Sequence, residues 1–133
     1  MDSTNLKILV DYAAAWNAHD IDRIMAMMTE DCVFLAGGGQ QACGERFVGA
    51  PAVRSRFVEV WTYFPDARWS APTHATSGDR GFSTWLFLGT GPDGRRVEVN
   101  GCDLFTFRDG LIAVKDTYLK ARDQAPVTEV SNA

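Results

Sequence analysis

Apolar residues recur at helical spacing in three stretches of the first half of the chain. Two overlapping stripes run from Thr4 to Ala18 behind a Ser3/Thr4 cap; they are formed by Leu6, Leu9, Ala13 and Trp16 and by Leu9, Tyr12 and Trp16. Asp20 can cap a short second helix whose apolar face holds Ile21, Ile24, Met25 and Met28. A third helix begins at Pro51 and ends before Pro65, with a stripe at Val53, Phe57, Val60, Trp61 and Phe64.

Alternating residues predict strands in the rest of the chain. A short strand covers Cys32 to Ala36, and the glycine-rich stretch from Gly37 to Gly49 is expected to be a loop. Four further strands are separated by turn sequences: Ala67 to Thr76, Gly81 to Thr90, Arg96 to Phe107 and Leu111 to Ala121. Helices followed by an antiparallel meander predict an α+β fold, and 133 residues predict a single domain over residues 1–133.

One strand contains a residue that its neighbours do not explain. Val99, Gly101, Asp103, Phe105 and Phe107 share one side of an alternating strand, and all but Asp103 are residues expected inside. An unpaired carboxylate among phenylalanines is costly. Either this side is not buried, or Asp103 has a partner, or its carboxyl stays protonated.

The turn after this strand decides what Asp103 faces. A three-residue turn with Gly110 left-handed puts Asp103 opposite Lys115, whereas a two-residue turn at Asp109 and Gly110 puts it opposite Asp116. An inward Lys115 would keep the carboxylate charged. The pair would then be either structural or part of a catalytic site.

Charge and composition exclude several classes of protein. The net charge is −4 and the chain has no basic run, so we expect no nucleic-acid partner. The three cysteines form no CxxC pair and suggest neither a disulfide framework nor a metal site, and no motif implies a cofactor. The N-terminus does not read as a secretory signal and no segment reads as a membrane span, so we expect a cytoplasmic protein.

The chain resembles the NTF2-like superfamily, in particular its SnoaL-like and ketosteroid isomerase-like branches. The resemblance covers nearly the whole chain and is carried by WNAHDIDRIMAMMTEDCVF and by the closing hairpin CDLFTFRDGLIAVKDTYLK. It implies a cystatin-like cone, in which a curved antiparallel sheet wraps around three N-terminal helices and an apolar pocket opens at one end. It also implies a hydrophobic small-molecule partner and a homodimer formed through the sheet. In the hairpin it favours the register with Lys115 opposite Asp103, which puts Ala113, Lys115, Thr117 and Leu119 on the pocket side.

The resemblance also implies roles for single residues. Ketosteroid isomerases combine an aspartate base with an oxyanion hole of tyrosine and protonated aspartic acid. Tyr12 and Asp103 match the oxyanion-hole positions, whereas Ala36 stands where the base is expected. The Asp-Arg-Asp arrangement of limonene epoxide hydrolases is missing, which excludes that activity. SnoaL-type cyclases use an inward aspartate and histidine, and Asp103 with His74 is the available combination.

These considerations give two hypotheses. The first is an isomerase- or cyclase-like enzyme that performs acid/base chemistry on a small hydrophobic carbonyl compound, with Asp103, Tyr12 and Lys115 as catalytic residues. The second is a non-catalytic protein that binds a hydrophobic small molecule, favoured by the missing base at Ala36. In both, the ligand-binding residues are expected to be Trp16, Phe34, Phe57, Trp61, Leu86, Phe105, Thr117 and Leu119. Tyr12 and His74 have alternative readings as ordinary packing residues.

Overall fold

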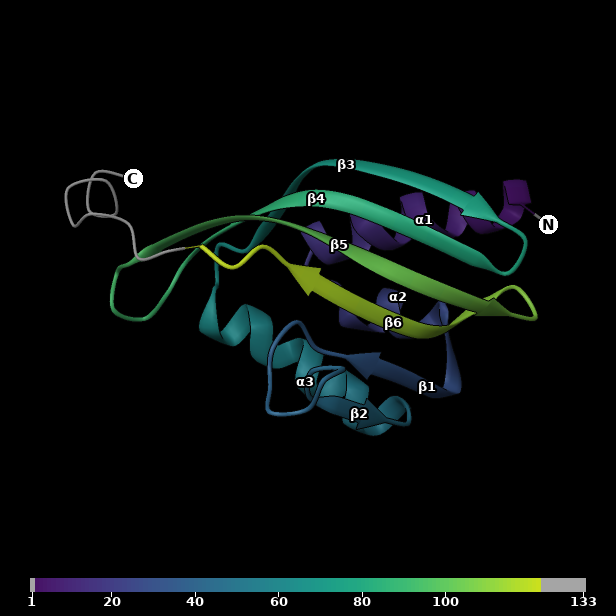
Figure 1. The fold of residues 1–133 in the computed structure, drawn as a ribbon, viewed down its shortest axis with the longest axis horizontal. Coiled ribbons are helices and arrows are strands. Elements are labelled where there is room, and N and C mark those ends of the chain that lie inside the picture. The colour runs from purple at the N-terminus through teal and green to yellow at the C-terminus, as the bar shows by residue number, and fades with distance from the viewer. Residues whose placement is uncertain (1, 123–133) are drawn as a thin grey trace.

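Three helices pack against one six-stranded sheet in the computed structural model, which describes residues 2–122 (Figure 1). The helices are α1 (Asp2–Asn17), α2 (Ile21–Ala26) and α3 (Ala50–Tyr63). The strands are β1 (Met28–Leu35), β2 (Arg46–Val48), β3 (Arg68–Ser77), β4 (Arg80–Thr90), β5 (Arg96–Arg108) and β6 (Leu111–Leu119). The predicted order of elements is confirmed. The polar tail that the sequence suggests from Asp123 onward lies outside the described residues.

Two local predictions need correction. The first helix already includes Ser3 and Thr4, which were expected to cap it. The stretch predicted as a loop contains β2, because Arg46, Phe47 and Val48 pair with the end of β1. The cap of the second helix is confirmed, since the Asp20 side chain accepts a hydrogen bond from the backbone N–H of Arg23 at 3.1 Å.

The strands follow the order β2-β1-β6-β5-β4-β3. All neighbouring pairs are antiparallel except β1 and β6, which run parallel, so the expectation of an antiparallel sheet is wrong for this one pair. The long connection between these two strands, through α3 and the meander, allows the chain to return in the same direction. The sheet is curved and does not close.

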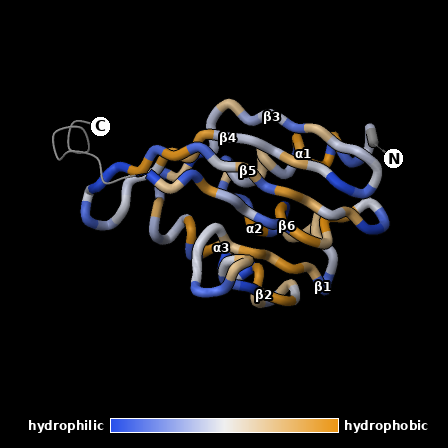
Figure 2. Tube along the Cα trace, viewed as in Figure 1, coloured by the Kyte–Doolittle hydropathy of each residue, from blue (hydrophilic) through white to orange (hydrophobic). Residues whose placement is uncertain are grey.

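The helices cover one face of the sheet and enclose the core between them (Figure 1). Phe105 and Phe107 are buried there as predicted, and the Phe105 ring meets the Tyr12 ring edge-on at a centroid distance of 5.6 Å. The same core includes Leu9, Ile24, Val53, Phe57 and Ile112. Figure 2 shows the hydrophilic residues gathered in the turns at the ends of the long strands.

The hairpin between β5 and β6 has a register that neither sequence-based alternative gave. Asp109 and Gly110 both have positive φ, 53° and 78°, as a two-residue type I′ turn requires, and Arg108 pairs with Leu111. A bulge follows, because Phe107 pairs with Ile112 while Thr106 pairs with Val114. Asp103 therefore lies opposite Thr117, and Lys115 lies opposite Phe105. The bulge returns Lys115 to the inner face, where it is a diagonal neighbour of Asp103.

Candidate functional site

The centre of the site is an ion pair buried on the inner face of the sheet. The Lys115 ammonium donates to Asp103 Oδ1 at 2.9 Å, and both side chains are less than a tenth exposed. The Thr117 hydroxyl donates to the same oxygen at 2.5 Å, and the Trp85 indole N–H donates to Asp103 Oδ2 at 3.0 Å. Donors from β4 and β6 thus hold the carboxylate of β5 from both sides.

Both carboxyl oxygens of Asp103 are engaged by neighbouring side chains, Oδ1 by Lys115 and Thr117 and Oδ2 by Trp85. Of the possibilities that the sequence left open, the structure therefore shows an Asp103 with a partner, the Lys115 ammonium. A protonated Asp103 that donates a hydrogen bond into the pocket is not part of this arrangement.

Three aromatic rings surround the other side of the Lys115 ammonium. Its nitrogen lies 5.2 Å from the ring centroid of Trp16, 5.5 Å from that of Phe34 and 5.9 Å from that of Phe57. Aromatic faces attract a cation, most strongly where water is excluded. The ammonium thus lies between a carboxylate and three aromatic rings inside an otherwise apolar core.

A pocket of about 400 Å³ extends from this cluster to the surface, which is within the usual size range of small-molecule sites. Lys115 and Thr117 provide polar groups on the sheet side, and Glu45 and Arg56 also line the pocket. Its apolar wall consists of Trp16, Phe34, Ala36, Val60, Phe64, Trp69, Trp85, Phe87 and Leu119, and the backbone of Gly37 to Gly39 completes the lining. The pocket suits an apolar ligand that carries one polar group.

Seven of the eight predicted ligand-binding residues fall into three groups. Trp16, Phe34, Thr117 and Leu119 line the pocket. Phe57 and Phe105 are almost completely buried in the core behind it. Trp61 stacks on the His19 ring at a centroid distance of 5.1 Å and is not part of the lining.

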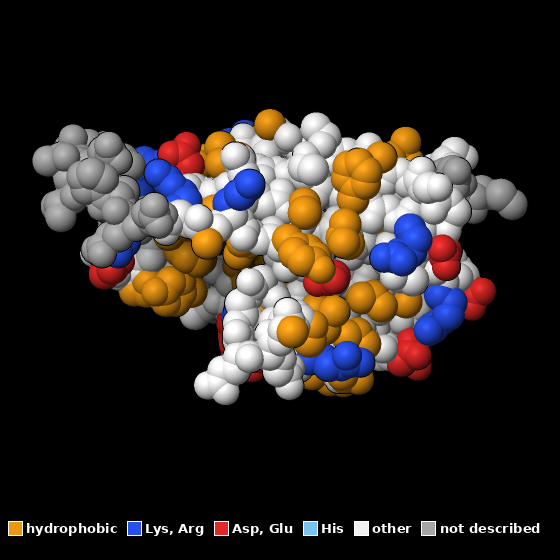
Figure 3. Space-filling model, viewed as in Figure 1, with side chains coloured by type: hydrophobic (Ala, Val, Ile, Leu, Met, Phe, Trp, Pro, Cys, Tyr) orange, Lys and Arg blue, Asp and Glu red, His pale blue; other side chains and the backbone are white. Residues whose placement is uncertain are grey.

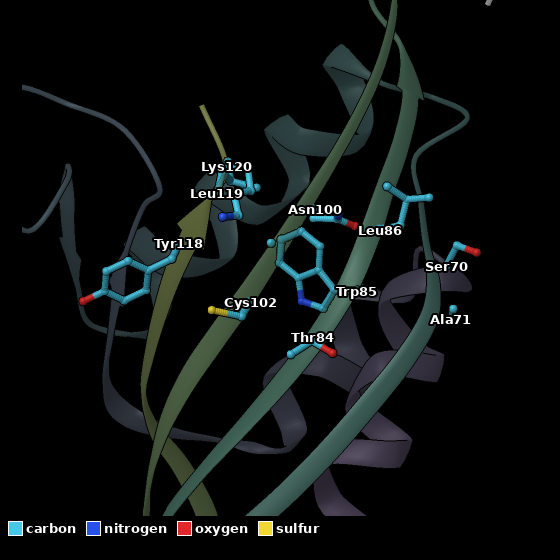
Figure 4. Close-up of a pocket in the computed structure, with 11 residues that line it drawn as sticks. Ser70, Ala71, Thr84, Trp85, Leu86, Asn100, Cys102, Tyr118, Leu119 and Lys120 are labelled. Atoms are coloured by element: carbon cyan, nitrogen blue, oxygen red, sulfur yellow. The ribbon is translucent and has the colours of Figure 1, made fainter. Parts of the chain in front are cut away.

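Leu86 was predicted in the pocket wall, and the structure corrects this. It lies on the outer face of the sheet, in a hollow of about 530 Å³ with Thr84, Asn100, Cys102 and Tyr118 (Figure 4). The reason is the alternation of β4, whose inner face carries Trp85 and Phe87 and leaves Leu86 pointing outward.

Tyr12 is close to the ion pair but is not hydrogen-bonded to it. Its hydroxyl donates to the Met28 sulfur at 3.6 Å, and the side chain is 3% exposed. Burial raises the pKa of Tyr12 well above its usual value. Tyr12 and Asp103 both border a small cavity of about 20 Å³, which also touches Lys115. The predicted contact of Asp103 is therefore made with Lys115 and not with Tyr12.

His74 is separated from Asp103 by one strand. It pairs with Ser83 of β4, its Nδ1 lies 2.7 Å from the Ser83 hydroxyl, and Ser83 in turn pairs with Asp103. Burial lowers the pKa of His74. His74 and Asp103 could therefore act together, as the aspartate and histidine of SnoaL-type cyclases do, only through Ser83, which lies between them.

Trp85 is the contact of Asp103 that sequence reasoning missed. Its indole lies over Gly101, where an added Cβ would be 2.5 Å from the ring; Figure 4 shows the ring beside β5, between Asn100 and Cys102. A glycine here permits this close approach. The sequence does contain a sign of this contact. Gly101 is an inward-facing glycine two residues before Asp103, and it leaves room for a large neighbouring side chain.

Other kinds of site find no support in the described part of the chain. Among residues 2–122, no three His, Cys, Asp or Glu side chains gather in a way that could hold a metal ion. No helix in the same range is long and apolar enough to cross a membrane.

A curved sheet around helices, with a pocket between the sheet and the helices, is the architecture of the NTF2-like, cystatin-like class of α+β cones. The profile of the SnoaL-like domain matches residues 9–115, and the chain belongs to this family. No curated protein sequence matches the chain.

Solved structures share this fold at low sequence identity. A proposed polyketide cyclase from Xanthomonas campestris pv. campestris is 20% identical, with a TM-score of 0.77 over 88% of this chain and 90% of that one. A protein of unknown function with a cystatin-like fold, also from Xanthomonas campestris, is 20% identical, with a TM-score of 0.79 over 91% and 92%. TerC, co-crystallised with polyporic acid, is 21% identical, with a TM-score of 0.75 over 88% and 92%. At such identities the likeness establishes the fold.

Proposed function

We propose that the protein is an isomerase- or cyclase-like enzyme that performs acid/base chemistry on a small hydrophobic carbonyl compound. The observation that carries this proposal is the Lys115 ammonium, which is held by Asp103 and borders an apolar pocket. A charged donor that is already oriented can stabilise the negative charge that develops on a carbonyl oxygen during enolisation.

The roles within the cluster follow from its hydrogen bonds. Lys115 acts as the group that polarises the substrate carbonyl. Asp103 pairs with the ammonium and fixes its direction, while Thr117 and Trp85 hold the carboxylate. Tyr12 supports this cluster from the core, since its hydroxyl is occupied by Met28.

The relatives add support at the level of ligand class. A proposed polyketide cyclase shares the fold, and TerC was crystallised with an organic molecule, polyporic acid. Both fit a pocket that takes a small organic compound.

The proposal predicts that the protein prefers a ketone to its hydrocarbon analogue. We expect 2-tetralone to bind about tenfold more tightly than tetralin, which has the same ring skeleton without the carbonyl, because a hydrogen bond to a charged group is worth ~1.5 kcal/mol or more. Titration monitored by tryptophan fluorescence measures both affinities. In a variant with Lys115→Met and Asp103→Asn, the preference should disappear while tetralin still binds. Equal affinities in the unaltered protein would contradict the proposal.

The second candidate function is a binding protein without catalysis. It is favoured by the position of Ala36, which lines the pocket and offers no ionisable group where the base of ketosteroid isomerase-like relatives is expected. This candidate also predicts ligand binding, but no chemical change in the ligand.

We also propose that the protein forms a homodimer through the outer face of the sheet. Figure 3 shows hydrophobic side chains gathered over the middle of this face. The outward positions of the strands include Phe82, which is 43% exposed, and Tyr118, which is 53% exposed, and Leu104 lies opposite Phe82 in the sheet. Contiguous apolar surface of this kind is typical of subunit interfaces.

A charge on this face should separate the subunits. Sedimentation at micromolar concentration is expected to show a dimer, and Phe82→Arg a monomer, because the arginine would be buried without a partner. Val10→Arg is the matched control, since Val10 is similarly exposed at 50% but lies on α1. A monomer for the unaltered protein would refute the dimer.

A cytoplasmic location is proposed from the sequence and agrees with the state of the cysteines. Cys32, Cys43 and Cys102 are all free thiols in the structure. Reduced thiols are normal in the cytoplasm, where disulfides are rare.

A further inference from the structure

Glu45 is a carboxylate in the pocket wall that the site described so far does not use. It lies just before β2, and it lines the same pocket as Lys115. Its backbone continues the β1–β2 ladder by one pair, since the N–H of Ala36 donates to the Glu45 carbonyl at 2.9 Å. Phe34 and Phe47 are partners in this ladder, and their rings stack at 5.9 Å. Two residues further along, Ala36 and Glu45 therefore share the inner face.

Two glycines fix the backbone around Glu45. Gly44 has a φ of +79°, and a Cβ there would lie 1.9 Å from the Ala36 carbonyl oxygen. Gly39 has a φ of +138°, and a Cβ there would lie 2.5 Å from the Glu45 nitrogen. The Glu45 N–H also donates to the Gly38 carbonyl at 2.8 Å. The loop is thus built so that Glu45 comes close to the end of β1.

The Glu45 carboxylate is available for chemistry. Within residues 2–122 it takes part in none of the ion pairs, whereas Arg56, the other charged group near the opening, pairs with Glu59 at 3.3 Å. The side chain is exposed at the mouth of the pocket, where it can exchange protons with water.

Sheet geometry places Glu45 across the pocket from Lys115. Lys115 pairs with Phe34, so Glu45 is two strands away and two residues further along. With strands about 4.8 Å apart and a rise of about 3.3 Å per residue, the two Cα atoms are about 12 Å apart. Both side chains are long and line the same pocket, so one small ligand in the pocket can contact both.

We propose that Glu45 is the general base of the reaction, which rests on the proposed function of the pocket. The Glu45 carboxylate removes a proton from the carbon next to the substrate carbonyl. The electrons of this C–H bond form a carbon–carbon double bond, and the carbonyl π electrons move to the oxygen, which Lys115 stabilises as an enolate. Protonated Glu45 returns the proton to the same carbon, which restores the ketone, or to a conjugated carbon, which isomerises it. The base missing at Ala36 is thereby supplied by the residue paired with Ala36.

Hydrogen–deuterium exchange of 2-tetralone in D₂O tests this assignment directly. The protein should accelerate loss of the C1 protons, followed by proton NMR, because Glu45 exchanges its proton with solvent between removal and return. Glu45→Gln should slow the protein-catalysed exchange at least about a hundredfold, the usual contribution of a general base, and leave the affinity for 2-tetralone within twofold. Retained affinity also shows that the variant is folded.

Glu59→Gln is the matched control, since it removes an exposed carboxylate from α3 that lies near the opening and does not itself line the pocket. Its exchange rate should equal that of the unaltered protein. Exchange that persists in Glu45→Gln, or that falls equally in Glu59→Gln, would overturn the role of Glu45. Binding of 2-tetralone without any catalysed exchange would overturn that role and leave the ketone pocket standing, whereas no binding at all would overturn both.

Discussion

Lys115→Met is expected to destabilise the protein by about 3–5 kcal/mol, because it leaves the Asp103 carboxylate buried without its ammonium partner. Asp103 and Lys115 are only 5% and 7% exposed, so water cannot take the place of the lost charge. The hydrogen bonds from Thr117 and Trp85 remain, but neither donor carries a charge. Urea denaturation measures the change as a lower midpoint at an unchanged slope.

The double variant with Lys115→Met and Asp103→Asn is the control for this experiment. It removes both charges and keeps an acceptor oxygen for the Trp85 N–H, while the asparagine NH₂ can donate to the Thr117 hydroxyl, so most of the lost stability should return. A single Lys115→Met variant within 1 kcal/mol of the unaltered protein would mean that the two groups are not an ion pair in solution. The single variant and its control therefore separate the cost of an unpaired charge from the cost of losing a lysine side chain.

Phe57→Ala is expected to have an effect of similar size, about 3–5 kcal/mol, through loss of buried surface and the cavity left behind. The Phe57 side chain is fully buried and meets the rings of Trp16 and Phe34 at centroid distances of 4.7 Å and 5.0 Å. It also lies near the Lys115 ammonium, so the variant should weaken binding of 2-tetralone as well as the fold.

Tyr63→Ala removes an aromatic side chain of similar size from the exposed side of the same helix, α3, and serves as the comparison. Because Tyr63 is 54% exposed, its loss should cost well under half as much when both variants are measured by thermal or urea unfolding. An equal loss of stability in the two variants would contradict the assignment of Phe57 to the core. Full retention of ketone affinity in Phe57→Ala would contradict its influence on Lys115.

Local pattern was sufficient for most elements of the fold. Helical spacing around Leu9 and Phe57 and alternation around Phe105 depend on neighbouring residues only, so they can be read along the chain. The short strand β2 could not be read in this way, because three residues form a strand only by pairing with β1. The parallel pairing of β1 with β6 is likewise a property of the assembled sheet.

The candidate site was visible in the sequence through Asp103, a carboxylate at a position where alternation demands an apolar residue. Its side of the strand was therefore fixed by local spacing alone. The residue that pairs with Asp103 was not fixed in this way. The two registers considered did not include the bulge after Phe107, which shifts the pairing of β5 with β6 by one residue. In the structure Lys115 reaches Asp103 through the combination of a two-residue turn and the bulge.

The amino-acid sequence by itself determined the α+β class, the helices, the long strands and an inward Asp103, since each depends on periodicity over a few residues. Only the tertiary structure decided which donors surround Asp103 and which residues share the pocket. Trp85 meets Asp103 across a neighbouring strand, and Glu45 shares the pocket with Lys115 from two strands away. Such neighbours are set by strand order and register, which arise from the packing of the whole sheet against its helices and are not encoded in any short segment.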